Sequence, residues 1–214
     1  MTIGFLDILS GISGDMMLGA CVSAGVPVDH LREELRKLPL DGYELRQRTL
    51  WRGEIAATHI DVVITGSDAS ADANDDHAQE HNEAPQLHHA HNHAHEHDHG
   101  PTRDHRPDHP HRSWADIRAL ISSSALDAEV KHRARTVFAV LAEAEALVHG
   151  VTVDDVHFHE VGAVDSIVDI VGTSVALEYL GIEQLFHSPV KTGSNALIHT
   201  QHGVMPVPAP ATIE

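Results

Sequence analysis

The apolar positions in the first quarter of the chain predict one strand followed by two helices. Residues Thr2–Leu9 form a short apolar run, which is typical of a buried strand. A helix is expected next, with Ser13 or Asp15 as its cap and its end near Gly25. Leucines at helical spacing then predict a second amphipathic helix over about 28–38.

Period-two alternation in the following residues predicts a β-hairpin. Its strands are expected at 43–51 and 55–65, on either side of an Arg52-Gly53 turn. One face of the second strand carries Thr58, Ile60, Val62 and Ile64.

Helical spacing returns in the second half of the chain. A helix is predicted from Ser113 to about Ile121, and a longer one ends at Gly150, a natural C-cap. A third helix is expected to continue to about Leu180.

The C-terminal residues predict short strands at Leu185–Val190 and Ala196–Thr200. Residues 205–211 are expected to be extended, without helix or sheet pairing, because prolines recur there. The chain stops soon afterwards, which suggests a split gene product or a fragment of a longer parent. This order of elements predicts one domain over 1–214 with an α/β fold, a mixed sheet flanked by helices, and α+β as the alternative.

A histidine-rich insert interrupts this pattern. We expect residues 66–112 to be disordered, because the segment has too little apolar side chain to offset its ordering entropy. Imidazole groups bind zinc, copper and nickel. A flexible segment cannot fix a coordination geometry, so we expect metal buffering here and not a defined active site. An affinity tag is the alternative, although the segment is internal and irregular. Its predicted metal ligands include His88, His89, His91, His93, His95, His97 and His99.

Composition excludes several classes of protein. The formal net charge is −18, and no basic patch could grip a phosphate backbone, so a nucleic-acid partner is not expected. No apolar run approaches the roughly twenty residues that cross a membrane, and the N-terminus lacks the basic region of a signal peptide. The single cysteine permits no internal disulfide, which favours a cytoplasmic location.

Residues 156–172 carry the strongest chemical signal. On a short strand His157 and His159 would face the same side, and Glu160 follows directly. Asp165 and Asp169 are four residues apart, which places both carboxylates on one helix face. We predict a divalent-metal site with the two histidines and Glu160 as its core and the two aspartates as ligands or as groups that orient the histidines. The alternative is ordinary packing with a solvated acidic face, although carboxylates beside apolar residues are costly unless paired or metal-bound.

The N-terminal turn forms a second candidate site. A strand that passes through a Gly-rich turn into a helix leaves backbone N–H groups free for an anion. Asp15 either caps the helix or joins Asp7 in holding a cation that bridges to a phosphate, and a purely structural tight turn is the alternative. The residues predicted to bind phosphate or substrate are Ser10, Gly11, Ser13, Gly14 and, from a later turn, Lys191. The predicted catalytic residues are Asp7, Asp15 and Glu160.

Three segments, 5–16, 156–172 and 202–212, resemble the nickel-insertion proteins of the nickel-pincer cofactor pathway, the LarC family. Residues 142–150 and the internal histidine-rich insert are similar too. The resemblance implies insertion of nickel into pyridinium-3,5-bisthiocarboxylic acid mononucleotide, which makes the cofactor of lactate racemase-type enzymes. It also implies a dependence on CTP with manganese or magnesium.

The chain departs from the family pattern in two ways. Family members are about twice as long, and their cytidine-nucleotide site is associated with a C-terminal half that is absent here. Some members occur as two polypeptides, so the implied partners are such a C-terminal half, the mononucleotide, the apo-enzyme that receives the cofactor and further copies of the chain. Gly193-Ser194-Asn195 stands where the family tends to have Gly-x-Gly, so the resemblance does not imply a phosphate role for that turn.

Three functions compete on this reading. The first is a nickel-inserting cyclometallase of the lyase class, or its N-terminal portion. The second is a nickel store or delivery metallochaperone without catalysis. A metal-dependent phosphohydrolase ranks last, because the chain lacks the dense Asp/His pairing of two-metal hydrolases.

Overall fold

The computed structural model describes residues 1–8, 11–65, 112–158, 161–193, 196–200 and 203–214. The chain divides into two units. The first consists of Met1–Thr65 and His109–Glu214, and the second of Gly66–Asp108. Apart from Arg112, the predicted histidine-rich insert lies outside the described residues.

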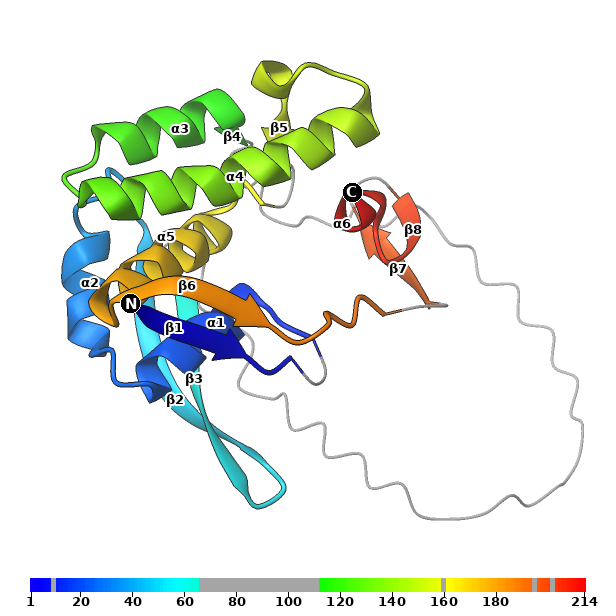
Figure 1. The fold of residues 1–214 in the computed structure, drawn as a ribbon. Helices are drawn as coiled ribbons and strands as arrows, with labels where there is room; N and C mark the ends of the chain where they lie inside the picture. The colour runs from blue at the N-terminus through cyan, green and yellow to red at the C-terminus, as the bar shows by residue number, and fades with distance from the viewer. Residues whose placement is uncertain (9–10, 66–111, 159–160, 194–195, 201–202) are drawn as a thin grey trace, which may run out of the picture. The chain divides into compact units, whose positions relative to one another are not determined.

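The first unit contains both helices and strands (Figure 1). In chain order they are β1 (Thr2–Leu6), α1 (Gly14–Ser23), α2 (Val28–Leu35), β2 (Tyr43–Arg52), β3 (Ile55–Ile64), β4 (Arg112–Ser113), α3 (Trp114–Ser123), α4 (Ala128–His149), the short 3-10 helix Val153–Asp155, β5 (His157–Phe158), α5 (Val164–Tyr179), β6 (Ile182–His187), β7 (Ala196–Thr200), β8 (Gly203–Val207) and α6 (Pro210–Ile213). No helix among the described residues is long and apolar enough to cross a membrane.

The strands pair two by two. β1 runs parallel to β6, whereas β2–β3, β4–β5 and β7–β8 are antiparallel. The predicted α/β class is confirmed, but the described strands form separate pairs where the sequence analysis expects a single mixed sheet. A tight turn joins β2 and β3, which are adjacent in the sequence. The partner of β1 is β6, which lies near the other end of the chain (Figure 1).

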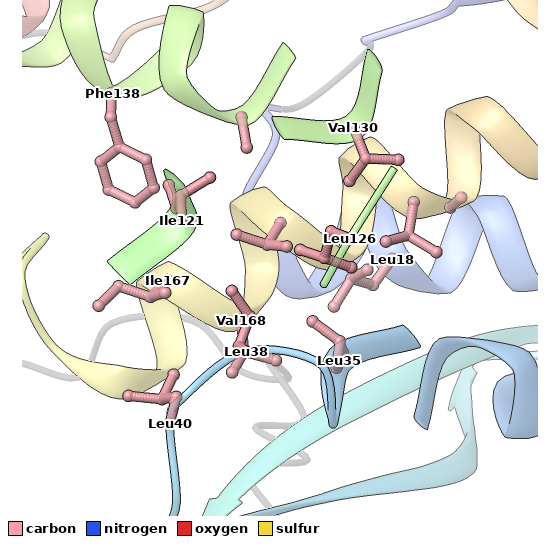
Figure 2. Packing of buried hydrophobic residues seen from close by; sticks show 14 of the residues in the cluster. Leu18, Leu35, Leu38, Leu40, Ile121, Leu126, Val130, Phe138, Ile167 and Val168 are labelled. Atoms are coloured by element: carbon pink, nitrogen blue, oxygen red, sulfur yellow. The ribbon is translucent and has the colours of Figure 1, made fainter. Parts of the chain in front are cut away.

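Helix α5 lies at the centre of the apolar core. Its residues Ile167, Val168 and Val171 are fully buried, and the helix packs against α1, α2 and α4 (Figure 2). Gly172 allows a close approach of α1, because an added Cβ would lie 3.1 Å from Leu18 Cδ2. This packing places the start of α1 beside α5, where residues of both candidate sites lie.

The start of α3 and the end of α4 lie where the sequence predicts them, and each has a cap. The Ser113 hydroxyl accepts a bond from the Asp116 N–H, and the Asp116 carboxylate accepts one from the Ser113 N–H, which completes a capping box. Gly150 ends α4 in the left-handed conformation, with φ 65°. Here the local sequence signals and the structure agree.

The C-terminal segment corrects the prediction that residues 205–211 are extended and unpaired. β8 pairs with β7, with Pro206 opposite Leu197, and α6 begins at Pro210. Proline is tolerated in β8 because, among the described strands, β8 pairs only with β7, so its other edge needs no backbone donor. At the first position of a helix the missing N–H costs nothing, which permits α6.

Some predicted boundaries also shift. α2 ends at Leu35 rather than at residue 38, and β1 ends at Leu6 rather than at residue 9. β6 covers Ile182–His187 instead of 185–190, because Gly181, with φ 63°, turns the chain directly out of α5.

Candidate functional site

The start of α1 and the middle of α5 meet at Gly14 and Asp169. An added Cβ on Gly14 would lie 2.6 Å from Asp169 Cγ, so the carboxyl group occupies the space that any larger residue would need. Asp15 follows Gly14, and its negative charge lies close enough to Asp169 to raise the pKa of that residue. Residues from the two predicted sites, the N-terminal turn and the 156–172 motif, are therefore brought together.

Asp169 is electrostatically unusual. Burial, then the negative charges of Asp15 and Asp165, raise the pKa of Asp169 from 3.8 to about 7. Its Oδ1 atom is buried and has no hydrogen-bond partner among the described residues. A carboxyl group in this setting is stabilised by a proton or by a cation placed beside it.

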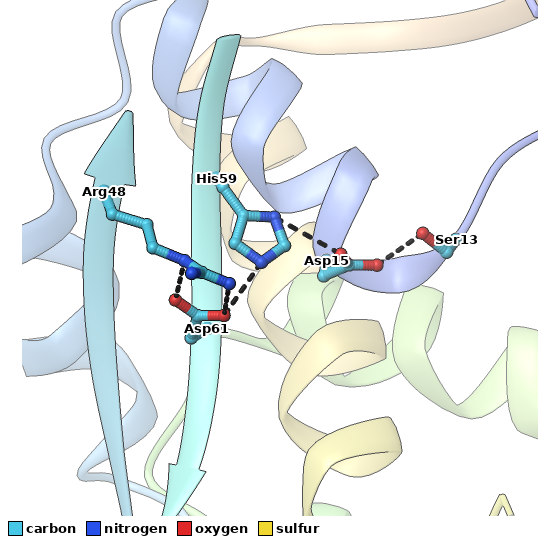
Figure 3. A network of polar contacts seen from close by, with 5 residues as sticks. All are labelled: Ser13, Asp15, Arg48, His59 and Asp61. Carbon is cyan, nitrogen blue, oxygen red and sulfur yellow. Dashed lines mark hydrogen bonds and ion pairs between the residues drawn. The ribbon is translucent and has the colours of Figure 1, made fainter. Parts of the chain in front are cut away.

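A polar network joins the same turn to the hairpin (Figure 3). The Ser13 hydroxyl donates to Asp15 Oδ1, and Asp15 Oδ2 lies 3.4 Å from His59 Nδ1. On the other side of the ring, His59 Nε2 lies 2.8 Å from Asp61 Oδ1, and Asp61 Oδ2 lies 2.7 Å from Arg48 Nε. The imidazole is thus held between two carboxylates, one from α1 and one from β3.

His59, Asp61 and Arg48 are not among the site residues predicted from the sequence. The available signal was the alternation of β3, which buries Ile60 and leaves His59 and Asp61 at the intervening positions. An imidazole and a carboxylate two residues apart on a strand share one face, so they can act on the same neighbour. Arg48 lies opposite His59 in the β2–β3 register, which no local pattern specifies.

The other residues predicted for the N-terminal site are spread around the turn. Ser13 is the N-cap residue of α1, but its side chain makes no capping bond to the helix backbone. Gly11 has φ 107°, a conformation that favours glycine. Asp7 and Lys191 are exposed, and Ser10 lies outside the described residues.

The residues predicted for the metal site are only partly described. His157 is exposed on β5 and lies opposite Ser113, whereas the next residue on the strand, Phe158, is buried. Asp165 is exposed in the first turn of α5, one turn before Asp169. His159 and Glu160 lie outside the described residues.

No group of three or more His, Cys, Asp or Glu side chains in the described ranges is placed to hold a metal ion. Two members of the predicted core are not among these ranges, so the metal site stays a prediction. His157 lies beside the N-terminal cap of α3, which is formed by Ser113 and Asp116. There, hydrogen bonds from Ser113 are the main cause that lowers the pKa of Asp116, and the charge of His157 adds a smaller effect.

Comparison with known proteins places the chain in a family. Residues 5–214 match the model of the nickel insertion protein family. The whole chain is 44% identical to the pyridinium-3,5-bisthiocarboxylic acid mononucleotide nickel insertion protein of Geobacillus kaustophilus, of which it covers 44%. It is 42% identical over 98% of its length to a putative nickel insertion protein of Roseiflexus castenholzii, of which it covers 42%. A putative nickel insertion protein of Pelobacter propionicus is 43% identical over 97% of the chain, which covers 43% of it.

The chain therefore spans less than half the length of these curated relatives. No solved structure matches it. Because the family model covers almost the whole sequence, the chain belongs to the nickel insertion protein family.

Proposed function

We propose that the protein takes part in the insertion of nickel into pyridinium-3,5-bisthiocarboxylic acid mononucleotide, as the N-terminal portion of a cyclometallase of the lyase class. The observation that carries the proposal is the meeting of the two motifs of the family resemblance, around Gly14 and Asp169. The name of the relative from Geobacillus kaustophilus supplies the substrate. The match over residues 5–214 supports the extension of that substrate to this chain.

Nickel is the cargo in this proposal. The residues assigned to hold it are His157, His159, Glu160, Asp165 and Asp169. Imidazole and carboxylate groups bind nickel well enough to collect it, and the softer sulfurs of the thiocarboxylates draw it onward. The unpartnered Oδ1 of Asp169 supports a role close to a cation, because a bound cation would offset the cost of charging this carboxyl group.

The phosphate of the mononucleotide is assigned to the turn before α1. There Gly11 leaves open space beside the backbone, Gly14 begins α1, and the first-turn N–H groups of α1 receive no side-chain cap from Ser13. Asp7 and Asp15 are assigned to position a cation that bridges to the phosphate. Ser10 and Lys191 are assigned as further phosphate-binding residues on the basis of the sequence alone. CTP with manganese or magnesium is assigned to the part of the longer family members that this chain lacks.

Nickel storage and delivery without catalysis is the second candidate. It is favoured by the composition of the chain, which has 21 histidines, seven of them crowded into residues 88–99. The two candidates differ in one product. Only the first predicts a nickel-containing mononucleotide, once the rest of a longer relative is supplied together with CTP.

Nickel titration tests the assigned site. A variant that lacks residues 77–111, whose fold is checked by circular dichroism, removes the background of weak histidine sites. We expect one tight nickel site in this variant and its loss when His159→Ala is added, while His132→Ala, an exposed histidine on α4, leaves it intact. Equal stoichiometry and affinity in all three proteins would contradict the assignment.

Turnover tests the proposed reaction separately. The chain, the remaining part of the Geobacillus kaustophilus relative, nickel, CTP and the thiocarboxylated mononucleotide are combined, and the nickel-containing product is sought by mass spectrometry. Nickel binding without product would favour storage and delivery over insertion.

A further inference from the structure

One face of the β1–β6 sheet is apolar, and more than half of each of its large side chains is exposed. Gly4 faces the core side of this sheet, because an added Cβ would lie 2.8 Å from Leu185 Cδ1 and 3.2 Å from Ile182 Cγ2. Ile3 and Phe5 flank Gly4 on the same strand, so they point to the opposite side.

Three large side chains form this outward apolar face. Ile3, Phe5 and Phe186 are 52%, 65% and 52% exposed. Phe5 lies opposite Phe186 in the parallel register, which places two aromatic rings on neighbouring strands. Contiguous exposed apolar groups of this size mark an interaction surface more often than a free surface.

An apolar groove continues from this face. It has a volume of about 270 Å³ and lies between the end of β1 and the first half of α1. The large apolar residues that line it are Phe5, Leu6, Ile8, Ile12, Met16 and Met17. Ile12 and Met16 are exposed, so the apolar surface extends from the sheet onto the helix.

Parallel sheets are almost always covered on both faces, and strands within them are apolar on both sides. β1 has that pattern, since Thr2–Leu6 contains no charged residue. On the core side α5 packs against β6, and Leu6 contributes to the core. The outward face therefore has the apolar sequence of a covered surface, but none of the described elements forms a layer over it.

The lengths of the relatives indicate what that layer is. The chain covers 44% of the Geobacillus kaustophilus protein and 42% of the Roseiflexus castenholzii protein, so more than half of each lies outside the matched region. We infer that this remaining part of the longer family members packs an apolar surface on the outward apolar face and its groove. The inference rests on the fold and on family membership, and it holds whether or not the nickel chemistry proposed above is correct.

Cysteine labelling tests the inference in two intact proteins. Phe5→Cys in this chain, and a cysteine at the aligned position of the full-length Geobacillus kaustophilus relative, are treated with a maleimide, and the labelled peptide is quantified by mass spectrometry. We expect labelling to be about tenfold or more slower in the full-length relative, because access there requires local opening of the interface. Ile3→Cys provides a second position if Phe5→Cys fails to fold, and the native Cys21 is buried.

The matched control is Val140→Cys on α4, which is 61% exposed and so resembles Phe5 in accessibility. We expect this position to label at similar rates in both proteins. Equal rates at the Phe5 position in the two proteins, or equal protection of both positions, would overturn the inference. A rate at Phe5→Cys that falls with protein concentration, together with a dimeric mass in light scattering, would assign the face to a second copy and overturn it too.

Discussion

Asp15, in the first turn of α1, raises the pKa of Asp169, which lies on α5. When a partly buried carboxyl group lies near a second negative charge, the two do not both ionise readily, so one of them retains its proton. A cation between them would relieve this repulsion and would lower the pKa of Asp169. The pair thus connects the packing of α1 on α5 with the proposed handling of a metal ion.

Asp169 should make the stability of the protein depend on pH. In the unfolded chain this carboxyl group loses its proton near its ordinary pKa of 3.8, whereas in the folded protein it retains the proton up to about pH 7. The folded state binds more protons between these values, so this group lowers stability as pH rises through that window. Asp169→Asn should therefore gain stability relative to the native chain between pH 4 and 8, by on the order of 1 to 2 kcal/mol after allowance for solvent screening.

Urea unfolding of both proteins at several pH values measures this difference. The matched control is Glu33→Gln, which removes an exposed carboxylate from α2 and none of the charges that raise the pKa of Asp169. Its stability difference from the native chain should change much less with pH. Parallel pH curves for Asp169→Asn and the native chain would show that Asp169 titrates normally.

The influence of Asp15 on Asp169 can be measured directly. Asp15→Asn should lower the pKa of Asp169, since it removes one of the two charges that raise it. The pKa should stay above 3.8, because burial is the larger cause. Carbon-13 NMR of the aspartate carboxyl groups follows the titration, and Asp61→Asn controls for the change in net charge. An Asp169 pKa that is the same in Asp15→Asn and Asp61→Asn would contradict the pairing.

Local sequence signals predicted most of the elements. The end of α4 at Gly150 and the hairpin around Arg52 and Gly53 follow from residues that lie within a few positions of each other. Strand pairing is different, because the partner of β1 is β6, far along the chain, and no local pattern names it. The expectation at Pro206 was wrong because proline is excluded from central strands, whereas β8 pairs only with β7 in the part of the chain that the structure describes.

In the candidate site, too, local features could be predicted from the sequence, whereas contacts between distant residues could not. The residue types at Asp15 and Asp169 were identified from spacing and composition, but as members of two separate sites. Their proximity follows from the packing of α1 on α5, where Gly172 admits Leu18, and such packing is not encoded in a short window of sequence. His59 was missed because a single histidine on a strand carries no motif until its neighbours in space are known.

Two glycines in this packing should differ sharply when they are changed to alanine. A Cβ at Gly19 on α1 would meet the backbone carbonyl oxygen of Thr58, which cannot move without displacing β3. A Cβ at Gly172 on α5 would meet the tip of the Leu18 side chain at 3.1 Å, which can rotate away. In a helix, alanine is more stable than glycine by roughly 1 kcal/mol. The severity of the clash therefore decides whether each substitution raises or lowers the stability of the protein.

Gly19→Ala should therefore destabilise the protein by about 1 to 3 kcal/mol, as overpacking does. Gly172→Ala should be near neutral, because the helix gain offsets a small rearrangement of Leu18. Chemical denaturation measures both values. Equal effects of the two substitutions would mean that α1 moves freely on β3.

Ser113 should stabilise the α3 cap and, through it, the strand that carries His157. Its hydroxyl accepts from the Asp116 N–H, and β4, to which Ser113 belongs, pairs with β5. Ser113→Ala should cost about 1 kcal/mol of stability, whereas Ser113→Thr should retain most of it and Ser122→Ala, at an exposed position on the same helix, should not show this loss.

The pH dependence separates loss of this cap from a general loss of packing. Hydrogen bonds from Ser113 are the main cause that lowers the pKa of Asp116, so this contribution is present above the ordinary pKa of 3.8 and is lost as pH falls through the lower folded value. The cost of Ser113→Ala should accordingly shrink in acid, and the Asp116 pKa should rise in the variant when followed by NMR. Faster amide exchange at His157 in Ser113→Ala, but not in Ser122→Ala, would show that the cap also steadies β5. A cost that is independent of pH, with an unchanged Asp116 pKa, would assign the loss to packing alone.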